Sequence, residues 1–274
     1  MRRTFAAFIL IISLFMAVPA IAEPFEDAAN AFNRGDYKTA HRLIKPLAEQ
    51  GLPVAQYMLG LMYYNSKGVP QDYAEAVRWF RKAADQGHAD AQFILGVMYT
   101  LGQGVSQGYA QAVKWFRKAA DQGHADAQSN LGLMYYNSKG VPQDYAQAVK
   151  WFRKAADQGV ASAQYNLGLM YYNSKGVSQD YAEATKWFRK AADQGDADAQ
   201  FILGLMYAKG EGVQQDYVLA HMWLNLASSR YSASEKERRE KAEKNRDIAA
   251  SRMTPAQIAK AQKLGREWKP KKVQ

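Results

Sequence analysis

Five of the six tryptophans recur at a constant interval of 36 residues, and this period constrains the fold more than any other feature of the chain. The series is Trp79, Trp115, Trp151, Trp187 and Trp223. Glycines keep the same period, from Gly60 to Gly204 and from Gly68 to Gly212. A unit of this length cannot bury its own apolar face, so similar units stack on their neighbours. The period predicts a solenoid of five units, at residues 52–87, 88–123, 124–159, 160–195 and 196–231.

Each unit is predicted to contain two helices, which makes the expected fold all-α. In the first unit, apolar residues recur at helical spacing over 54–65, and again after Asp72, which can cap a second helix with Glu75 as its capping-box partner. Gly60 lies inside the first helix, where glycine is unfavourable by about 1 kcal/mol relative to alanine, so a neighbouring helix is expected to approach it closely. Trp79 lies on the apolar face of the second helix and is expected in the core between units.

The repeated motif runs Ala-x-x-x-Leu-Gly-x-Met-Tyr, then Gly-Val, then Asp-Tyr-x-x-Ala-x-x-Trp-Phe-x-x-Ala-Ala-x-x-Gly, over residues 52–231. This motif resembles the Sel-one-like repeat family, which is related to the tetratricopeptide repeats. The resemblance implies a right-handed α-solenoid of antiparallel helix pairs whose first helices line a concave face. It also implies protein–protein interaction rather than catalysis. Some secreted members bind host proteins, including secretory immunoglobulin A, and other bacterial members support envelope signalling or complex assembly.

The first 22 residues have the pattern of a bacterial export signal. Arg2 and Arg3 precede an almost wholly apolar run over 5–18, and Ala20-Ile21-Ala22 forms a small-x-small cleavage site. The apolar run is shorter than the ~20 residues that span a bilayer. We therefore expect cleavage after Ala22, no integral membrane segment in the mature chain, and a periplasmic or secreted protein. An uncleaved membrane anchor is the alternative.

Two segments flank the repeats. Residues 23–51 are expected to form a degenerate N-terminal helix pair, and residues 232–274 a helical cap, because a terminal repeat exposes an apolar face. The formal charge of +10 is concentrated in this tail: residues 228–274 hold 14 Lys and Arg against 6 Asp and Glu, whereas residues 23–227 hold 20 of each. The mixed signs of the tail are typical of a solvated helix, so no nucleic-acid partner is expected.

Familiar catalytic and metal-binding motifs are missing from the sequence or out of context. Residues 104–108 match the Gly-x-Ser-x-Gly nucleophile pattern, but they join two predicted helices, whereas that pattern requires a preceding strand. His88 and His124 recur at one turn and are too few for a metal site, and the recurring carboxylates Asp90, Asp126 and Asp198 are interpreted as helix caps. Near-identical units repeat one surface and do not converge unlike groups. We predict no catalytic residue, no metal and no cofactor.

Variation between otherwise near-identical units marks the candidate partner-binding positions. They lie on the first helices and carry aromatic or amide side chains: Tyr57, Phe93, Asn130, Tyr165, Asn166, Phe201, Tyr64, Tyr136 and Tyr172. Rigid amphipathic aromatic surfaces are well suited to protein binding. The alternative is that some of these tyrosines pack between neighbouring units.

These features predict a secreted or periplasmic, non-enzymatic scaffold that binds a protein or peptide on its concave face and is itself a monomer. Host proteins are among the candidate partners. Cysteine-rich members of the resembled family have been described as penicillin-binding or weakly penicillin-hydrolysing, so a β-lactamase-like, penicillin-interacting hydrolase is a second function class, although this chain has no cysteine. A third is an envelope structural protein that binds cell wall or membrane through the basic tail.

Overall fold

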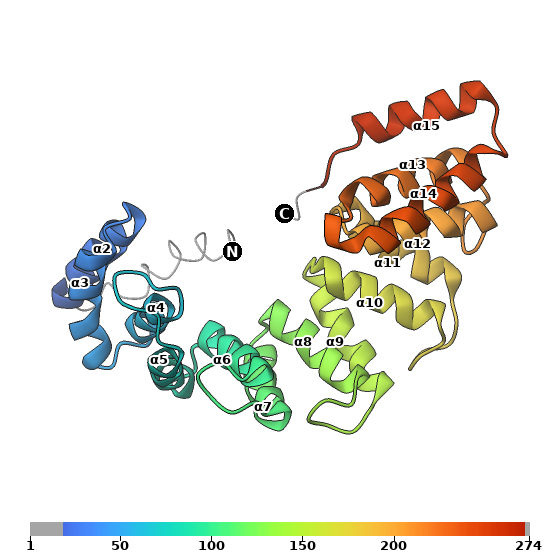
Figure 1. Cartoon of the computed structure of the whole chain (residues 1–274). Coiled ribbons are helices and arrows are strands. Elements are labelled where there is room, and N and C mark those ends of the chain that lie inside the picture. The colour runs from blue at the N-terminus through green and yellow to red at the C-terminus, as the bar shows by residue number, and fades with distance from the viewer. Residues whose placement is uncertain (1–18, 272–274) are drawn as a thin grey trace. The chain divides into compact units, whose positions relative to one another are not determined.

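The computed structural model describes residues 19–271, and every regular element in this range is a helix (Figure 1). The prediction of an all-α fold is confirmed. The expected export signal lies outside the described residues, except for positions 19–22 at the start of the first labelled helix. The chain divides into two compact units: unit 1 ends at His124 and unit 2 begins at Ala125. Within the described range no helix is both long and apolar enough to cross a membrane.

Unit 1 is a stack of antiparallel helix pairs in which consecutive helices pack against each other. Its helices in the described range are α2 (Pro19–Asn33), α3 (Tyr37–Glu49), α4 (Pro53–Tyr64), α5 (Tyr73–Asp85), α6 (Ala89–Leu101) and α7 (Tyr109–Asp121). The pair α2–α3 precedes the repeats. In each repeat the helix that carries the Leu-Gly pair is called the first helix, and the one that carries the Trp-Phe pair or its counterpart is called the second helix.

Unit 2 continues the same pattern and ends in two helices of a different kind. Its elements are α8 (Ala125–Tyr136), α9 (Tyr145–Asp157), α10 (Ala161–Tyr172), α11 (Tyr181–Asp193), α12 (Ala197–Lys209), α13 (Tyr217–Arg230), the 3₁₀ turn η2 (Ala233–Glu235), α14 (Lys236–Ala250) and α15 (Pro255–Glu267). The helix α15 starts at a capping box, in which Thr254 and Gln257 bond reciprocally. The short turn η2 precedes α14.

The second helices of the repeats begin at a carboxylate cap, as predicted, except α7, which begins at Gly108. Asp72 accepts a hydrogen bond from the backbone N–H of Glu75 at 2.9 Å, which satisfies one free donor of the first turn. Equivalent bonds are formed by Asp144, Asp180 and Asp216. The Glu75 carboxylate, predicted to complete a capping box, instead pairs with Arg78 one turn further on. A single side chain therefore fixes where each of these helices starts.

Within the first four repeats the glycine of the first helix lies under an aromatic ring of the second. A Cβ atom on Gly60 would lie 2.7 Å from the ring of Phe80, and one on Gly96 would lie 2.5 Å from the ring of Phe116. Both rings are fully buried. The close helix approach expected at Gly60 is thus real, and it is made by the second helix of the same repeat.

An amide pair joins the first helix of a repeat to the end of its second helix, and the glutamine on the first helix is buried. The Nε2 atom of Gln86 donates to Gln56 Oε1 at 2.8 Å, and Gln194 donates to Gln164 in the same way. In the last repeat, the position of this donor is taken by Arg230, whose guanidinium lies 4.3 Å from the ring of Trp268. In the last repeat a contact to the C-terminal segment thus replaces the amide contact between the two helices of the repeat.

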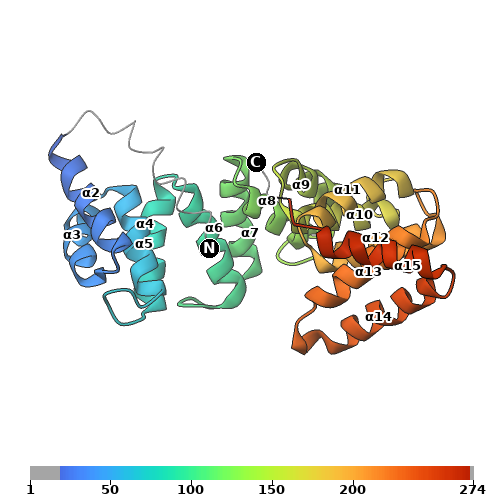
Figure 2. The same ribbon diagram turned by 90° about the horizontal axis from the view of Figure 1, so that it is seen from above.

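The outer side of α13 is apolar where the other second helices are charged. The positions of Glu183, Lys186 and Lys190 in α11 are taken in α13 by Leu219, Met222 and Leu226. In both views α13 lies between α14 and α15 (Figure 1, Figure 2), and Met222 and Leu226 are buried in a cluster that Leu264 and Trp268 cover. The tail therefore covers the last repeat.

Replacing Trp187 with alanine is expected to destabilise unit 2 by about 3–5 kcal/mol, the usual result of truncating a core aromatic residue. Trp187 is 5 % exposed and packs with Phe152 and Leu167 of the preceding helices. Because repeats couple to their nearest neighbours, the loss of hydrogen-exchange protection should centre on α9–α11 and spare α2–α5. The control is Lys190→Ala, which removes the ammonium 4.0 Å above the same ring and should cost less than about 1 kcal/mol. Unchanged exchange in Trp187→Ala would contradict the packing.

Gly108→Asp is expected to stabilise unit 1 by about 0.5 kcal/mol, because it supplies the carboxylate cap that the other second helices have. Gly108 has φ −159° and ψ 100°, close to −146° and 101° at Asp72, and a Cβ there meets only ordinary contacts. Thermal unfolding of Gly108→Asp and Gly108→Ala separates the cap from the backbone effect. A midpoint for the Asp variant at or below that of the Ala variant would refute the prediction.

Candidate functional site

The predicted tyrosines at the C-terminal ends of the first helices bond to the loop of the following repeat. The pairs are Tyr64–Gln103 at 3.1 Å in unit 1, and Tyr136–Lys175 at 2.7 Å and Tyr172–Glu211 at 2.8 Å in unit 2. Burial and the hydrogen bond to Glu211 raise the pKa of Tyr172 to about 12. These side chains are half-buried and connect successive repeats, so packing between units, the alternative left open by the sequence, accounts for much of their surface.

The predicted aromatic residues in the middle of the first helices also pack inside the fold. Tyr57 is 7 % exposed and stacks on His88, and Phe93 stacks on His124, each with ring centroids 4.6 Å apart. Burial raises the pKa of the Tyr57 hydroxyl. With so little exposed surface, Tyr57 offers a partner almost no contact area.

The same position in unit 2 is more open. Tyr165 is half-buried against the ring of Phe188 at 5.8 Å, and Phe201 is half-buried beside Tyr231. Burial raises the pKa of Tyr165 to about 12, and the nearby Asp198 carboxylate acts in the same direction. Each ring thus has one face for packing and a limited edge for a partner.

The predicted amides occupy the neighbouring row of the first helices. Asn130 donates to the backbone oxygen of Asp126, and Asn166 to that of Ser162, each at 2.8 Å. These bonds use the Nδ2 groups within the helix. Both side chains are half-buried. Asn130 lies on the same face of α8 as Leu133, and Asn166 lies on the same face of α10 as Leu169, because the members of each pair are three residues apart.

One apolar surface on unit 1 was missed at the level of sequence. On α6, Ile94, Val97 and Leu101 share one face at i, i+3 and i+7, and Leu101 is 57 % exposed. The equivalents of Leu101 are Asn65, Asn137, Asn173 and Lys209. A comparison of this one position across the repeats would have found the apolar surface, because a single leucine interrupts a row of polar residues.

The turn histidines and carboxylates have roles different from those expected. His88 caps α6 by accepting a hydrogen bond from the Ala91 N–H at 3.4 Å, and burial lowers the pKa of the imidazole. Asp90, expected to be a cap, lies inside the helix, and its Oδ1 is 3.2 Å from His124 Nε2. That hydrogen bond holds the pKa of Asp90 below its usual range.

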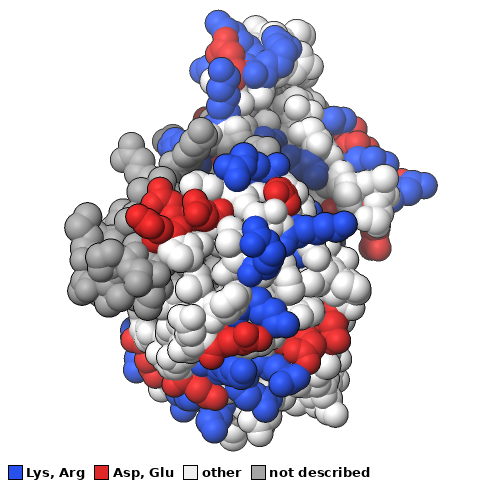
Figure 3. All heavy atoms as spheres, turned by 90° about the vertical axis from the view of Figure 1, so that its left-hand side faces the viewer, with Lys and Arg blue, Asp and Glu red and all other residues white. Residues whose placement is uncertain are grey.

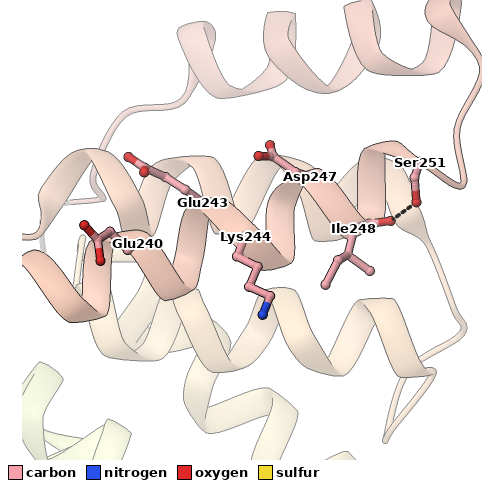
Figure 4. A pocket seen from close by; sticks show the side chains of 6 residues that line it. All are labelled: Glu240, Glu243, Lys244, Asp247, Ile248 and Ser251. Carbon is pink, nitrogen blue, oxygen red and sulfur yellow. Dashed lines mark hydrogen bonds between the residues drawn. The ribbon is translucent and has the colours of Figure 1, made fainter.

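In the described range, 19–271, no group of three or more His, Cys, Asp or Glu side chains could hold a metal ion. Ser106 lies exposed in the loop between α6 and α7, where the strand that a nucleophile elbow requires is replaced by a helix. An open depression on α14 is lined by Glu240, Glu243, Lys244, Asp247 and Ile248 of this helix and by its C-cap residue Ser251 (Figure 4). Its side chains point outward along that helix, so it encloses no substrate.

The N-terminal end of unit 1 carries charges of both signs, whereas the C-terminal tail is mainly positive. On the end of unit 1 that carries α2 and α3, cationic and anionic side chains are interspersed (Figure 3). The strongest single-sign region of the sequence lies after Asp247, where the only acidic residue is Glu267. Mixed signs over the repeats leave shape and apolar contacts as the means of recognition there.

The sequence model of the Sel1 repeat matches five segments, at 53–88, 89–124, 125–160, 161–196 and 197–232. The solved structure of a Sel1 repeat protein from Oxalobacter formigenes is 32% identical, with 78% of this chain and 88% of that chain covered and a TM-score of 0.73. A protective antigen of uropathogenic Escherichia coli with an SLR fold is 28% identical, covering 90% and 68%, with a TM-score of 0.43. An immunity protein from Pseudomonas aeruginosa is 22% identical, covering 77% and 82%, with a TM-score of 0.44. No curated protein matches the chain.

Proposed function

The chain belongs to the Sel1 repeat family, and from this premise we propose that it is an exported, non-enzymatic scaffold that binds a protein or peptide through the exposed side of its first helices. Repeats of this family generally serve as protein-interaction scaffolds. The partner surface has two parts, an apolar one on unit 1 and an amide-rich one on unit 2. We treat each unit by itself.

The observation that carries the proposal is the apolar face of α6. Leu101 is 57 % exposed, whereas the other four repeats have a polar residue at the equivalent position. An exposed leucine at this position is explained if it contacts a partner. Leu61 of α4 and Ile94 of α6 pack on the same cluster and extend the surface beyond Leu101. Apolar side chains at the centre of an interface contribute most of its binding energy.

The fixed geometry of the first helices supports binding further. The tyrosine–loop bonds, such as Tyr172–Glu211, hold successive repeats together, so the binding surface is ordered before a partner arrives. Preorganisation reduces the ordering cost that association otherwise carries. In unit 2 the free amide oxygens of Asn130 and Asn166 suit the backbone N–H groups of an extended peptide.

Leu101→Asn is expected to weaken partner binding about 30-fold while leaving thermal stability unchanged, since an anchor residue contributes about 2 kcal/mol. This substitution should not disturb the fold. Asn137 at the equivalent position donates to the Leu133 carbonyl at 3.1 Å, and an asparagine at position 101 can donate to the Val97 carbonyl in the same way. Quantitative affinity capture from envelope extract and host secretions, with the wild type and Leu101→Asn in parallel, identifies proteins that depend on this side chain.

The reciprocal variant Asn137→Leu is the matched control, because it adds an exposed leucine elsewhere. The double variant should stay as weak as Leu101→Asn. A set of captured proteins that is identical for wild type and Leu101→Asn would move the binding site away from α6.

Export is the second part of the proposal. It is supported by the positive start, the apolar run over 5–18 and the Ala20-Ile21-Ala22 site of the sequence. The expected outcome is cleavage after Ala22 and a mature chain that begins at Glu23. Intact-mass measurement of the protein recovered from the periplasm and the medium checks this. A species that keeps Met1 and stays with the membrane would show that the segment is an anchor.

A further inference from the structure

The positive charge of the tail collects on the outer face of α15. The inner side of this helix, with Ala261 buried and Ile258 and Leu264 half-buried, packs on α13. On the opposite side Lys260 and Arg266 are exposed and, in the described part of the chain, form no ion pair. Between them Lys263 pairs only loosely, at 3.9 Å, with Glu267, and both are more than 60 % exposed.

The neighbouring helix α14 has a different charge pattern, because its six cations are interspersed with four acidic residues and three of the cations are paired. Lys236 pairs with Glu240 at 3.6 Å, and Arg246 with Asp247 at 2.9 Å. Arg238 binds Asp198 of α12 at 3.0 Å. The two helices of the tail thus have the same net charge of +2, but α14 mixes the two signs along its length, whereas α15 has a single acidic residue at its end.

The cations of α15 continue a surface that begins on α11. There Lys186, Arg189 and Lys190 are exposed on the outer side of the second helix. The equivalents of these residues in α13 are Met222, Asn225 and Leu226, which carry no charge. A Cβ on Gly265 would lie 4.0 Å from Met222 and 3.8 Å from Asn225, so α15 covers these positions and restores the positive charge in a new layer.

The C-terminal residues attach this layer to α11. Lys271 donates from its backbone N–H and its Nζ to the carbonyl and carboxylate of Asp193, each at 2.7 Å. This pairing neutralises the acidic residue at the end of α11. It also places the end of the tail beside that helix. We call the exposed cations Lys186, Arg189 and Lys190 of α11 and Lys260, Lys263 and Arg266 of α15 the cationic face of unit 2. Within it Lys186 pairs with Glu183 at 2.8 Å.

We propose that this cationic face of unit 2 binds the surface of an anionic phospholipid bilayer. The choice of a bilayer rests on the export proposed above, which carries the chain through one membrane and leaves it beside phospholipid. On α15 the exposed apolar residues in the turns before Lys260 are small, Ala256 and Ala259, so the face adsorbs to headgroups and does not insert. It also has no exposed aromatic ring on which a nucleic-acid base could stack, since Trp268 packs on Trp223 at 6.2 Å.

The test is co-sedimentation of the exported protein with vesicles that contain phosphatidylglycerol and with vesicles of phosphatidylcholine alone. Each basic residue near an anionic surface changes affinity roughly fivefold, so Lys260→Gln/Lys263→Gln/Arg266→Gln should weaken binding to phosphatidylglycerol vesicles about 100-fold. Wild-type binding should fall steeply when salt rises above about 0.15 M. The matched control, Lys236→Gln/Lys241→Gln/Lys244→Gln on α14, removes the same net charge and should lose much less.

Several outcomes overturn the proposal. Equal binding to both kinds of vesicle would point to apolar insertion, which is also what a retained export segment would cause. Equal losses in the α14 and α15 variants would show that net charge alone acts. Tighter binding to a short DNA duplex than to phosphatidylglycerol vesicles at the same salt would make the face a nucleic-acid surface. Capture of a protein partner through Leu101 is independent of all three results.

Discussion

The fold depends on the contact between a glycine in each first helix and a bulky apolar side chain in its second helix. At Gly132 and Gly168 a Cβ would lie 2.7 and 2.8 Å from the rings of Phe152 and Phe188. The missing side chain lets the two helices approach until the ring contacts backbone, which sets their spacing. Because the same spacing recurs, repeats within each unit can stack in register, and a position on one first helix lies in the same row as its equivalent on the next first helix of that unit. In the last repeat Leu224 replaces the ring and keeps the contact at Gly204.

Much of this architecture could be predicted from the sequence, because the period reports packing directly. The recurring tryptophans and glycines lie at the packing contacts, and the recurring Asp residues cap helices. The pair Thr254 and Gln257 forms the capping box at the start of α15. The candidate site was harder to predict. Tyr57 and Phe93 vary between repeats, yet they pack on His88 and His124. A helical aromatic residue whose partner lies about 30 residues further on cannot be separated from a surface residue by periodicity.

The loop residues that bond to the first-helix tyrosines also could not be predicted from the sequence. Tyr64, Tyr136 and Tyr172 each bond to a residue 39 positions on, and the partner is a glutamine, a lysine or a glutamate. The three bonds share geometry and not residue type, so no motif records them. Leu101, in contrast, could have been found, since its row is otherwise polar.

The two proposed surfaces follow from one difference between the helices of a repeat. First helices are enclosed by neighbours and expose a narrow row, where apolar and amide contacts can select a partner. Second helices expose a broad outer side that must stay hydrated, and they carry most of the charged residues of the repeats, such as Lys186 and Arg189. The tail covers the apolar outer side of α13 and presents its own cations to solvent, so the outer side of unit 2 stays hydrated. Recognition on the first helices is short-ranged and insensitive to salt, whereas attraction through the cationic face is long-ranged and screened by salt. Because the two interactions use different physics and opposite helices of the repeat, one can hold the protein at a surface while the other binds a partner.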